Sequence, residues 1–455
     1  MTTFVSVNPY TEQQFAEYPT LTEEQIEIVL SDADEAQKQW RNTSHQHRSE
    51  LFLTLASLIK QNVDQLAALA TLEMGKTFAE GKAEVLKCAR GCEFYAGHAE
   101  KLLQPQITTI ENGKEVHVMY EPMGTVLGIF PWNFPYWQIV RSATPVLIAG
   151  NAMLVKPAPN VPQCALALQK LFDEAGFPEG IIRTIFVDEK QIEQIIADNR
   201  INACTLTGSE KAGSIVASTA ARHIKKSVLE LGGSDPFIVM EDADVDLAMA
   251  SAVTARFQNN GQSCIAAKRF ILHAKIADEF LQKLINAVGK LKMGDPIEAS
   301  TNIGPLARKD LKDKLASQVD ESVKQGAKIL FQQTEIPEHG FFYPPTILTD
   351  IPKQSPAYNE EIFGTVLSVF VVDDEDQAIR VANDTRFGLG ASVWTKNIKR
   401  AKFLALYMQS GNVFVNSMVK SDPGFPFGGV KKSGFGRELG ENGLKEFCNI
   451  KVMMI

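Results

Sequence analysis

Cys264 is the side chain in this sequence best suited to covalent chemistry. It lies between the polar run Asn259 to Ser263 and the small residues Ala266 and Ala267. A structural cysteine usually lies inside an apolar periodic run, so this context indicates a thiol exposed in a cleft. Such a thiol can attack an electrophilic carbon. A cysteine that only packs is the alternative.

Glu230 is a candidate general base. It ends the otherwise apolar run SVLEL and precedes Gly232 and Gly233, which allow another backbone to approach closely. A carboxylate at such a position is partly desolvated, which raises its pKa and suits it to proton transfer near neutral pH. A glutamate paired with a nearby lysine is the alternative.

Three further segments follow β-rich runs and could bind parts of a ligand. Asn133 lies between Pro131 and Pro135, which stiffen the backbone around an amide donor, as an oxyanion hole requires. Lys156 ends the run AMLVK, where an ammonium could bind ribose hydroxyls. The segment TGSEKAG at 207–213 could hold a pyrophosphate at a helix N-terminus, although it is not a GxGxxG fingerprint. The alternatives are that Asn133 only caps a turn, that Lys156 is a solvated strand end, and that the segment 207–213 is a simple helix cap.

Alternating β-rich and helical segments must position these residues. A capping-box pattern at Thr22 to Gln25 predicts a helix ending near Trp40, and two more helices are expected before Gly97. From Val126 onward, short apolar runs alternate with helix-length stretches, and a second such block starts near Asp235. This pattern predicts two α/β domains with parallel sheets and a ligand crevice at the carboxyl ends of the first sheet's strands.

Two segments fit neither block. Residues 106–123 contain an Asn-Gly turn at Asn112 and Gly113 between β-rich arms, which predicts a hairpin. The tail Phe447 to Ile455 is apolar. An unpaired apolar hairpin and an unpaired apolar tail together suggest a sheet shared between subunits.

The composition limits the partners. A net charge of −8 and the absence of a dense Lys/Arg run disfavour nucleic acid and anionic lipid. The longest uncharged apolar stretch, Ser142 to Val155, is too short to span a bilayer, and no secretory signal is expected at the start. Six cysteines in 455 residues suit a reducing cytoplasm, and Cys88 and Cys92 are interpreted as packing residues. We therefore expect a cytoplasmic protein with a small-molecule partner.

The order and spacing of seven motifs resemble the aldehyde dehydrogenase superfamily over nearly the whole chain. They are PWNFP at 131–135, VKPA at 155–158, LTGSEKAG at 206–213, LELGG at 229–233, GQSC at 261–264, EIFG at 361–364 and PFGGVKKSGFGRE at 426–438. The resemblance implies an aldehyde dehydrogenase-like α/β fold with two parallel-sheet domains and a β-hairpin oligomerisation arm. It implies an NAD(P)-binding domain of residues 1–105 and 124–232, an arm of 106–123 and 440–455, and a catalytic domain of 233–439.

The resemblance also implies roles. Cys264 is expected as the nucleophile, Glu230 as the base that activates water, and Asn133 as part of the oxyanion hole. Together they would oxidise an aldehyde through a thiohemiacetal and a thioester, without a metal. The residues expected to bind NAD or NADP are Trp132, Lys156, Pro159, Thr207, Gly208, Ser209, Gly213, Leu231, Glu361 and Phe363.

One departure from the family concerns the cofactor. NAD-preferring members often carry a glutamate where this sequence has Pro159, and its carboxylate repels a 2′-phosphate. Because Pro159 removes that repulsion and Lys211 lies in the first turn of the following helix, NADP is acceptable as well as NAD.

Within the family, the sequence is most similar to succinate-semialdehyde dehydrogenases. Arg141 matches an arginine that these enzymes direct at the substrate carboxylate, and Ser421 matches a serine of the same site. Gln258 stands where some members have a second arginine, so selectivity could be broad. An Arg141 that only pairs with a surface acid is the alternative.

Two other functions remain as hypotheses. One is a general aliphatic or aromatic aldehyde dehydrogenase with a pocket lined by Tyr136, Trp137 and Phe425. The other is a structural protein of the same fold without catalysis, which the presence of both Cys264 and Glu230 disfavours. Whatever the function, we expect a homo-oligomer, by default a homodimer, with a homotetramer as the alternative.

Overall fold

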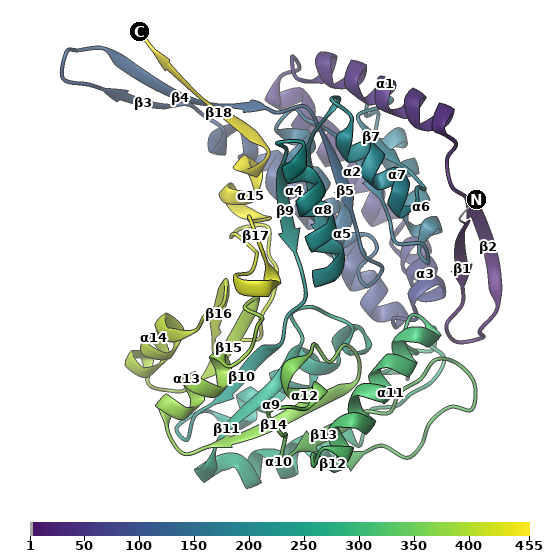
Figure 1. The fold of residues 1–455 in the computed structure, drawn as a ribbon, viewed down its shortest axis with the longest axis vertical. Helices are drawn as coiled ribbons and strands as arrows, with labels where there is room; N and C mark the ends of the chain where they lie inside the picture. Colours follow the sequence, from purple (N-terminus) through teal and green to yellow (C-terminus); the bar gives the residue numbers. More distant parts are fainter. Residues whose placement is uncertain (1–2) are drawn as a thin grey trace.

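Two mostly parallel sheets, each covered by helices on both faces, make up most of the computed structural model, which describes residues 3–455. The first sheet lies in the upper half of Figure 1 and the second in the lower half. This arrangement confirms the expected α/β class. No helix within residues 3–455 is both long enough and apolar enough to cross a membrane.

The first sheet has six strands in the order β17-β9-β8-β5-β6-β7, and only the β17–β9 pair is antiparallel. Its central strand is buried on both faces, as expected for a parallel sheet covered by helices. The strands are β5 (Thr125–Ile129), β6 (Ala152–Lys156), β7 (Ile182–Thr184), β8 (Ile201–Thr207), β9 (Lys226–Glu230) and β17 (Gly434–Phe435).

Alternate side chains of this sheet enter two different cores. Val126 packs with the helices of one face, and Leu127 packs with those of the other. The first face carries α2 (His45–Gln61), α3 (Val63–Met74), α4 (Phe78–Leu102), α5 (Trp137–Ile148) and α6 (Pro162–Glu174), and the second carries α1 (Glu23–Trp40), α7 (Glu189–Ala197) and α8 (Glu210–Arg222).

The N-terminal region differs in part from the prediction. The capping box is confirmed, because Thr22 and Gln25 exchange hydrogen bonds at the start of α1. Three helices, not two, follow α1, since Asn62 leaves helical geometry between α2 and α3 (φ −99°, ψ 16°). A short hairpin of β1 (Thr3–Val7) and β2 (Gln14–Pro19) was not predicted. Nine of its eleven strand residues are partly or fully exposed, so their hydrophobic alternation is weak.

The second sheet has seven strands in the order β12-β13-β14-β11-β10-β15-β16, parallel except for β12–β13. Its strands are β10 (Asp235–Val239), β11 (Ala267–His273), β12 (Lys328–Gln332), β13 (Thr346–Thr349), β14 (Val366–Val372), β15 (Gly390–Trp394) and β16 (Asn412–Val415). The helices of this region are α9 (Val245–Phe257), α10 (Ala274–Val288), α11 (Lys309–Lys324), α12 (Pro356–Asn359), α13 (Glu375–Asn383) and α14 (Ile398–Tyr407), with short 3-10 turns η1 (Gln258–Gly261) and η2 (Lys431–Ser433).

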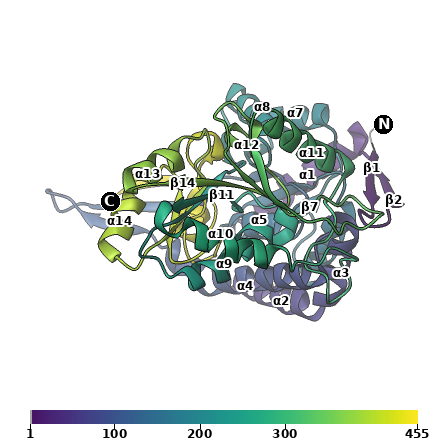
Figure 2. The ribbon, with the colours of Figure 1, turned by 90° about the horizontal axis from the view of Figure 1, so that it is seen from below.

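A three-stranded antiparallel sheet projects from the body (Figures 1 and 2). The Asn-Gly hairpin is confirmed, with Gly113 at φ +76°. The tail is not unpaired as expected, because it pairs with the hairpin of its own chain. The strands are β3 (Gln106–Thr109), β4 (Glu115–Pro122) and β18 (Cys448–Met454), and α15 (Gly440–Glu446) leads into the last of them.

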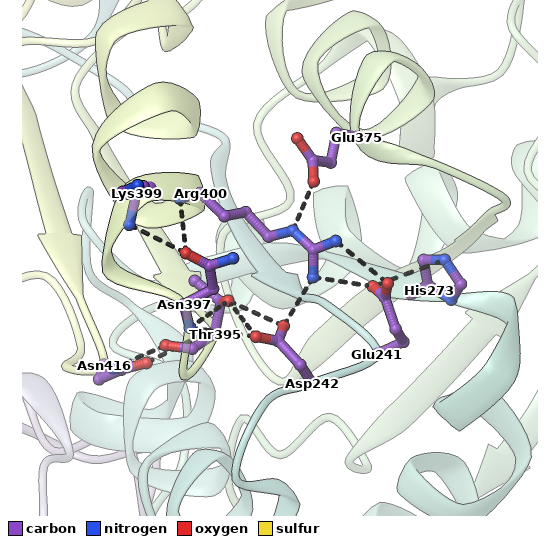
Figure 3. A network of polar contacts seen from close by, with 9 residues as sticks. All are labelled: Glu241, Asp242, His273, Glu375, Thr395, Asn397, Lys399, Arg400 and Asn416. Carbon is purple, nitrogen blue, oxygen red and sulfur yellow. Dashed lines mark hydrogen bonds and ion pairs between the residues drawn. The ribbon is translucent and has the colours of Figure 1, made fainter.

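An ion-pair network closes the carboxyl edge of the second sheet, where parallel sheets often bind ligands. Figure 3 shows Arg400 of α14 between three acids. Its guanidinium lies 2.8 Å from Asp242 and 3.1 Å from Glu241, just after β10, and also pairs with Glu375 at the start of α13. Because all three acids contact one guanidinium, the network joins the end of β10 to α13 and α14. Cys264 precedes β11 and therefore lies near the other side of this sheet, at the amino ends of its parallel strands.

Candidate active site

Cys264 lies where two cavities meet. A cavity of about 330 Å³ runs along the carboxyl ends of the first sheet's strands, and we call it the strand-end cavity. A cavity of about 340 Å³ lies beside α4 and α5, and we call it the helix cavity. Among the described residues, Cys264 and Gln138 are the two that line both. A group bound in either cavity can therefore approach the same sulfur atom.

An unusual backbone presents Cys264. Asn259, Asn260 and Gly261 all have left-handed conformations, with φ of 59°, 56° and 70°. Asparagine and glycine tolerate this region best, which explains the NNG sequence before the cysteine. A Cβ atom on Gly261 would lie 2.0 Å from the carbonyl oxygen of Gly364, so only glycine fits there. The loop is therefore held tightly before it reaches the thiol.

The surroundings of Cys264 keep its thiol protonated at neutral pH. Burial raises the pKa of the thiol to about 11, against the opposing positive charges of Arg141 and Lys268. The Lys268 ammonium donates to the carbonyl oxygens of Ser263 at 2.8 Å and Cys264 at 2.7 Å. Formation of the thiolate therefore requires a change in this environment or a proton acceptor.

The amide of Asn133 is fixed beside the thiol. Its Nδ2 donates to the backbone carbonyl oxygen of Gln262 at 3.0 Å, and the backbone carbonyl oxygen of Asn133 accepts from Asn259 Nδ2 at 2.8 Å. The side chain is buried and lines the strand-end cavity with Cys264. An amide nitrogen has two hydrogens, so one remains for a ligand oxygen.

Glu230 is buried at the end of β9 and is outside the linings of both cavities. Burial and the neighbouring Glu438 raise its pKa well above the usual range, although Arg141 and Arg437 oppose this. Within residues 3–455, neither of its carboxyl oxygens has a hydrogen-bond partner. Its Oε1 lies 2.7 Å from the position that a Cβ atom on Gly428 would occupy, so the glycine makes room for it. The carboxyl is thus turned toward Gly428, and its raised pKa favours the protonated form.

Arg141 lines the helix cavity and forms a buried ion pair. Its Nε lies 2.6 Å from Oε2 of Glu438, and one terminal nitrogen donates to Thr207 Oγ1 at 3.2 Å. The alternative that Arg141 only pairs with a surface acid is wrong, since its partner Glu438 is buried, with 4% of the residue exposed. Much of the charge of Arg141 is already compensated.

The strand-end cavity has features that suit a dinucleotide. Ser209 caps α8 by accepting from the amide of Ala212 at 3.2 Å, so the helix N-terminus faces the cavity. Helix N-termini and the nearby Lys211 attract phosphate. A Cβ atom on Gly232 would lie 2.4 Å from the Glu361 carboxylate, so glycine is required beside that acid. Seven predicted cofactor residues line this cavity: Trp132, Thr207, Gly208, Ser209, Leu231, Glu361 and Phe363.

Three predicted cofactor residues lie outside that lining. The ammonium of Lys156 is 5.3 Å from the ring centre of Phe4, and burial lowers its pKa to about 8. Pro159 is exposed. Gly213 packs against Leu231, because an added Cβ would approach its Cδ2 to 2.7 Å. The structure thus explains Gly213 by close packing of α8 on the sheet.

The expected substrate residues divide into two groups. Trp137 and Ser421 line the helix cavity and are joined by a 3.0 Å hydrogen bond. Tyr136 instead lies in the core, where its hydroxyl donates to the carbonyl oxygen of Leu66 at 2.9 Å. Phe425 packs against Phe414 and is outside the cavity lining, in which Phe427 is found instead.

Lys87 and Gln138 of the site were not predicted from the sequence. Lys87 of α4 reaches the helix cavity, where its ammonium donates to Ser421 Oγ at 2.7 Å. Gln138 of α5 is buried at the junction of the cavities. Lys87 is separated from Ser421 by 334 positions in the chain. No local motif marks such a long-range contact.

The chain is similar to known proteins over nearly its whole length. The model of the aldehyde dehydrogenase family matches residues 1–453. A probable succinate-semialdehyde dehydrogenase [NADP(+)] of Synechocystis is 47% identical over 450 residues, covering 99% of each chain. Succinate-semialdehyde dehydrogenase [NADP(+)] 1 of Mycobacterium tuberculosis is 45% identical over 452 residues, also covering 99% of each. The crystal structure of succinic semialdehyde dehydrogenase from Streptococcus pyogenes with NADP+ superposes with a TM-score of 0.97 at 35% identity, with 99% of both chains covered.

Proposed function

Because the chain belongs to the aldehyde dehydrogenase family, we propose that it oxidises succinate semialdehyde to succinate with NADP or NAD as the cofactor. The observation that carries this proposal is the position of Cys264 at the junction of two cavities. One cavity suits a dinucleotide and the other suits an aldehyde. The names of the relatives support the substrate and the cofactor.

We propose that Ser209, Glu361 and the N-terminus of α8 hold the cofactor in the strand-end cavity. Lys156, whose ammonium lies 5.3 Å from the ring centre of Phe4, would reach the ribose from the end of β6. When bound, the cofactor supplies a nicotinamide that accepts a hydride. We assign this binding role to residues 1–105 and 124–232, and the chemistry to 233–439.

In the first half of the reaction, Cys264 releases its proton to solvent and its sulfur bonds to the aldehyde carbon, giving a thiohemiacetal oxyanion. The free Nδ2 hydrogen of Asn133 and the backbone amide of Cys264 stabilise that oxygen. Hydride leaves the same carbon as the carbonyl bond re-forms, so the aldehyde is oxidised and a thioester remains on Cys264.

In the second half, Glu230 removes a proton from a water molecule that attacks the thioester. The carboxylate product leaves, and the thiol of Cys264 is restored. Because Glu230 faces Gly428, its side chain must turn toward the cavities and lose its own proton before this step. Its raised pKa suits a base that works near neutral pH.

The helix cavity supports the choice of substrate. Arg141 contributes positive charge at its wall, and Ser421, whose oxygen accepts from Trp137 Nε1, contributes a hydrogen-bond donor. A broad-specificity aldehyde dehydrogenase remains the second candidate, because Phe134, Trp137 and Phe427 make much of this wall aromatic.

We propose that the enzyme accepts NADP at least as well as NAD. Pro159 carries no charge that would repel a 2′-phosphate, and Lys211 lies at the mouth of the strand-end cavity. The three relatives described above are named or titled with NADP(+).

We also propose a cytoplasmic homodimer or homotetramer that assembles through the projecting arm of 106–123 and 440–455. β3 and β18 form the two edges of its sheet, and Ile107, Ile450 and Val452 are each more than half exposed. An exposed apolar edge is a template for another strand. All six cysteines are free thiols, which suits a reducing compartment.

The direct test is steady-state formation of NADPH and NADH with a panel of aldehydes, half of them bearing a terminal carboxylate. We expect the highest kcat/KM for succinate semialdehyde with NADP. Equal values for butanal and succinate semialdehyde would favour the broad-specificity enzyme. Absence of turnover with every aldehyde would refute the proposed activity.

A further inference from the structure

Lys87 is a cation without an acidic partner inside the helix cavity. Its ammonium donates to Ser421 Oγ at 2.7 Å and lies 4.4 Å from the ring centre of Trp137. No carboxylate of residues 3–455 lies within ion-pair distance of it. A partly buried ammonium with only neutral contacts is costly, and such a group commonly serves a ligand.

The acids nearest to Lys87 are already engaged. Glu84 pairs with Lys76 and accepts from the backbone amides of Tyr136 and Trp137, each at 2.9 Å. Asp422 lies 3.0 Å from Arg90, and Glu438 compensates Arg141. Glu80, also on the cavity wall, accepts from the amide of Asn259 at 2.6 Å. The positive charge of Lys87 therefore remains available.

Ser421 is arranged to donate into the cavity. Its oxygen accepts two hydrogen bonds, from Lys87 Nζ at 2.7 Å and from Trp137 Nε1 at 3.0 Å. A hydroxyl has two acceptor positions and one donor hydrogen, so only the hydrogen is left. A ligand that meets Lys87 and Ser421 together must therefore accept hydrogen bonds from both.

We propose that Lys87 joins Ser421, which the resemblance already places in the carboxylate site, in binding the carboxylate of the substrate, and that Lys87 determines the preference for aldehydes with a terminal carboxylate. This inference rests on the proposed function, which places the aldehyde at Cys264 in the same cavity. A carboxylate is negatively charged and only accepts hydrogen bonds, so it matches both groups. Arg141 adds positive potential but is held by Glu438.

The charge of Lys87 gives the site a pH dependence. Burial and the positive charge of Arg141 lower the pKa of Lys87 to about 8, with Arg90 acting in the same direction and Cys88 and Glu84 opposing. Lys420, at the exposed rim of the cavity, is a further cation near the site. A bound carboxylate favours the protonated ammonium, so binding should weaken as the pH rises through about 8.

The test compares Lys87→Met and Lys87→Arg with the wild-type enzyme on succinate semialdehyde and butanal. We expect Lys87→Met to lower kcat/KM for succinate semialdehyde by roughly 30- to 100-fold, mostly through KM, and to change butanal oxidation by less than about threefold. Lys87→Arg should retain part of the preference and lose its decline above pH 8, because arginine does not titrate there. Lys82→Met is the matched control, since Lys82 lies on the same helix and pairs with Asp64.

Succinate binding to the Cys264→Ala variant provides a readout that does not depend on turnover. Calorimetry near pH 8 in two buffers of different ionisation enthalpy should show proton uptake when Lys87 is present and none in Lys87→Arg. If Lys87→Met left the ratio of kcat/KM for succinate semialdehyde and butanal unchanged, the inference would be overturned. If the wild-type enzyme oxidised neither aldehyde, the proposed function would fail, whereas succinate binding abolished by Lys87→Met would still support the carboxylate site.

Discussion

Nε of Arg141 lies 2.6 Å from Oε2 of Glu438, and both side chains are almost completely buried. Burial raises the pKa of Glu438, and Arg141 opposes that rise. The negative charge of Glu438 also raises the pKa of Glu230. Burial is the main cause of the raised pKa of Glu230, and Arg141 opposes it, so Arg141 acts on the candidate base in addition to any contact with substrate.

Arg141→Leu should harm the whole enzyme and not only the use of charged substrates. It leaves a buried acid unpaired, which typically costs about 3 to 5 kcal/mol of stability. We expect a lower Tm and reduced kcat/KM for both succinate semialdehyde and butanal. Arg141→Leu combined with Glu438→Leu should recover part of the Tm. A loss confined to succinate semialdehyde at an unchanged Tm would instead make Arg141 the main carboxylate anchor, as the sequence suggested.

The thiol of Cys264 should react slowly at neutral pH in the free enzyme. Because burial raises its pKa to about 11, alkylation by iodoacetamide should accelerate about tenfold per pH unit between pH 7 and 10. Cys264→Ala is the control, since the other five cysteines are buried. A rate that levels off below pH 8 would show that the thiolate is already stabilised without ligands.

Pro159→Glu should change the cofactor preference. The new carboxylate would repel a 2′-phosphate and leave NAD largely unaffected, so we expect KM for NADP to rise roughly 10- to 100-fold. Pro159→Gln has a similar size without the charge and serves as the control. A cofactor ratio unchanged by the glutamate would place the discrimination at another residue, such as Lys211.

The Arg400 network should stabilise the protein at neutral pH but not in acid. Burial opposes the effect, but hydrogen bonds and the charge of Arg400 keep the pKa values of Glu241 and Asp242 below their ordinary range. This contribution is complete above the ordinary carboxyl pKa of roughly 4 and is lost as the pH falls through the lowered values.

Urea unfolding of Arg400→Met measures this contribution. Since the side chains are partly exposed, we expect a loss of only about 1 to 2 kcal/mol at pH 7, shrinking toward pH 2. Lys324→Met removes an exposed charge 3.7 Å from Glu321 and should have little effect. A stability loss that did not depend on pH would mean that packing of the arginine stem, and not its charge, is responsible.

The sequence was informative where function depends on local patterns. The apolar runs ending at Lys156, Thr207 and Glu230 are strands of one sheet, and their carboxyl ends meet at one edge as expected. The NNG residues before Cys264 are those that left-handed backbone requires. Such features are encoded within a few neighbouring residues.

The walls of the helix cavity were harder to predict. Tyr136 and Trp137 are adjacent and both aromatic, yet one enters the core and the other the cavity, because successive residues at a helix start point about 100° apart. Phe427 lines the cavity, whereas Phe425, two residues earlier, is half-buried outside it against Phe414. Lys87 meets Ser421 only through the packing of distant segments, which hydrophobic periodicity does not report.

The central claim is that the reaction passes through a thioester on Cys264, and mass spectrometry of a stalled enzyme tests it most directly. Glu230→Gln should still form the thioester but hydrolyse it slowly, giving a burst of NADPH followed by a slow steady state. After rapid quenching and digestion, the peptide containing Cys264 should carry a succinyl group, and Cys264→Ala should yield neither the burst nor the adduct. A burst without acylation of Cys264, or turnover by Cys264→Ala, would contradict the account.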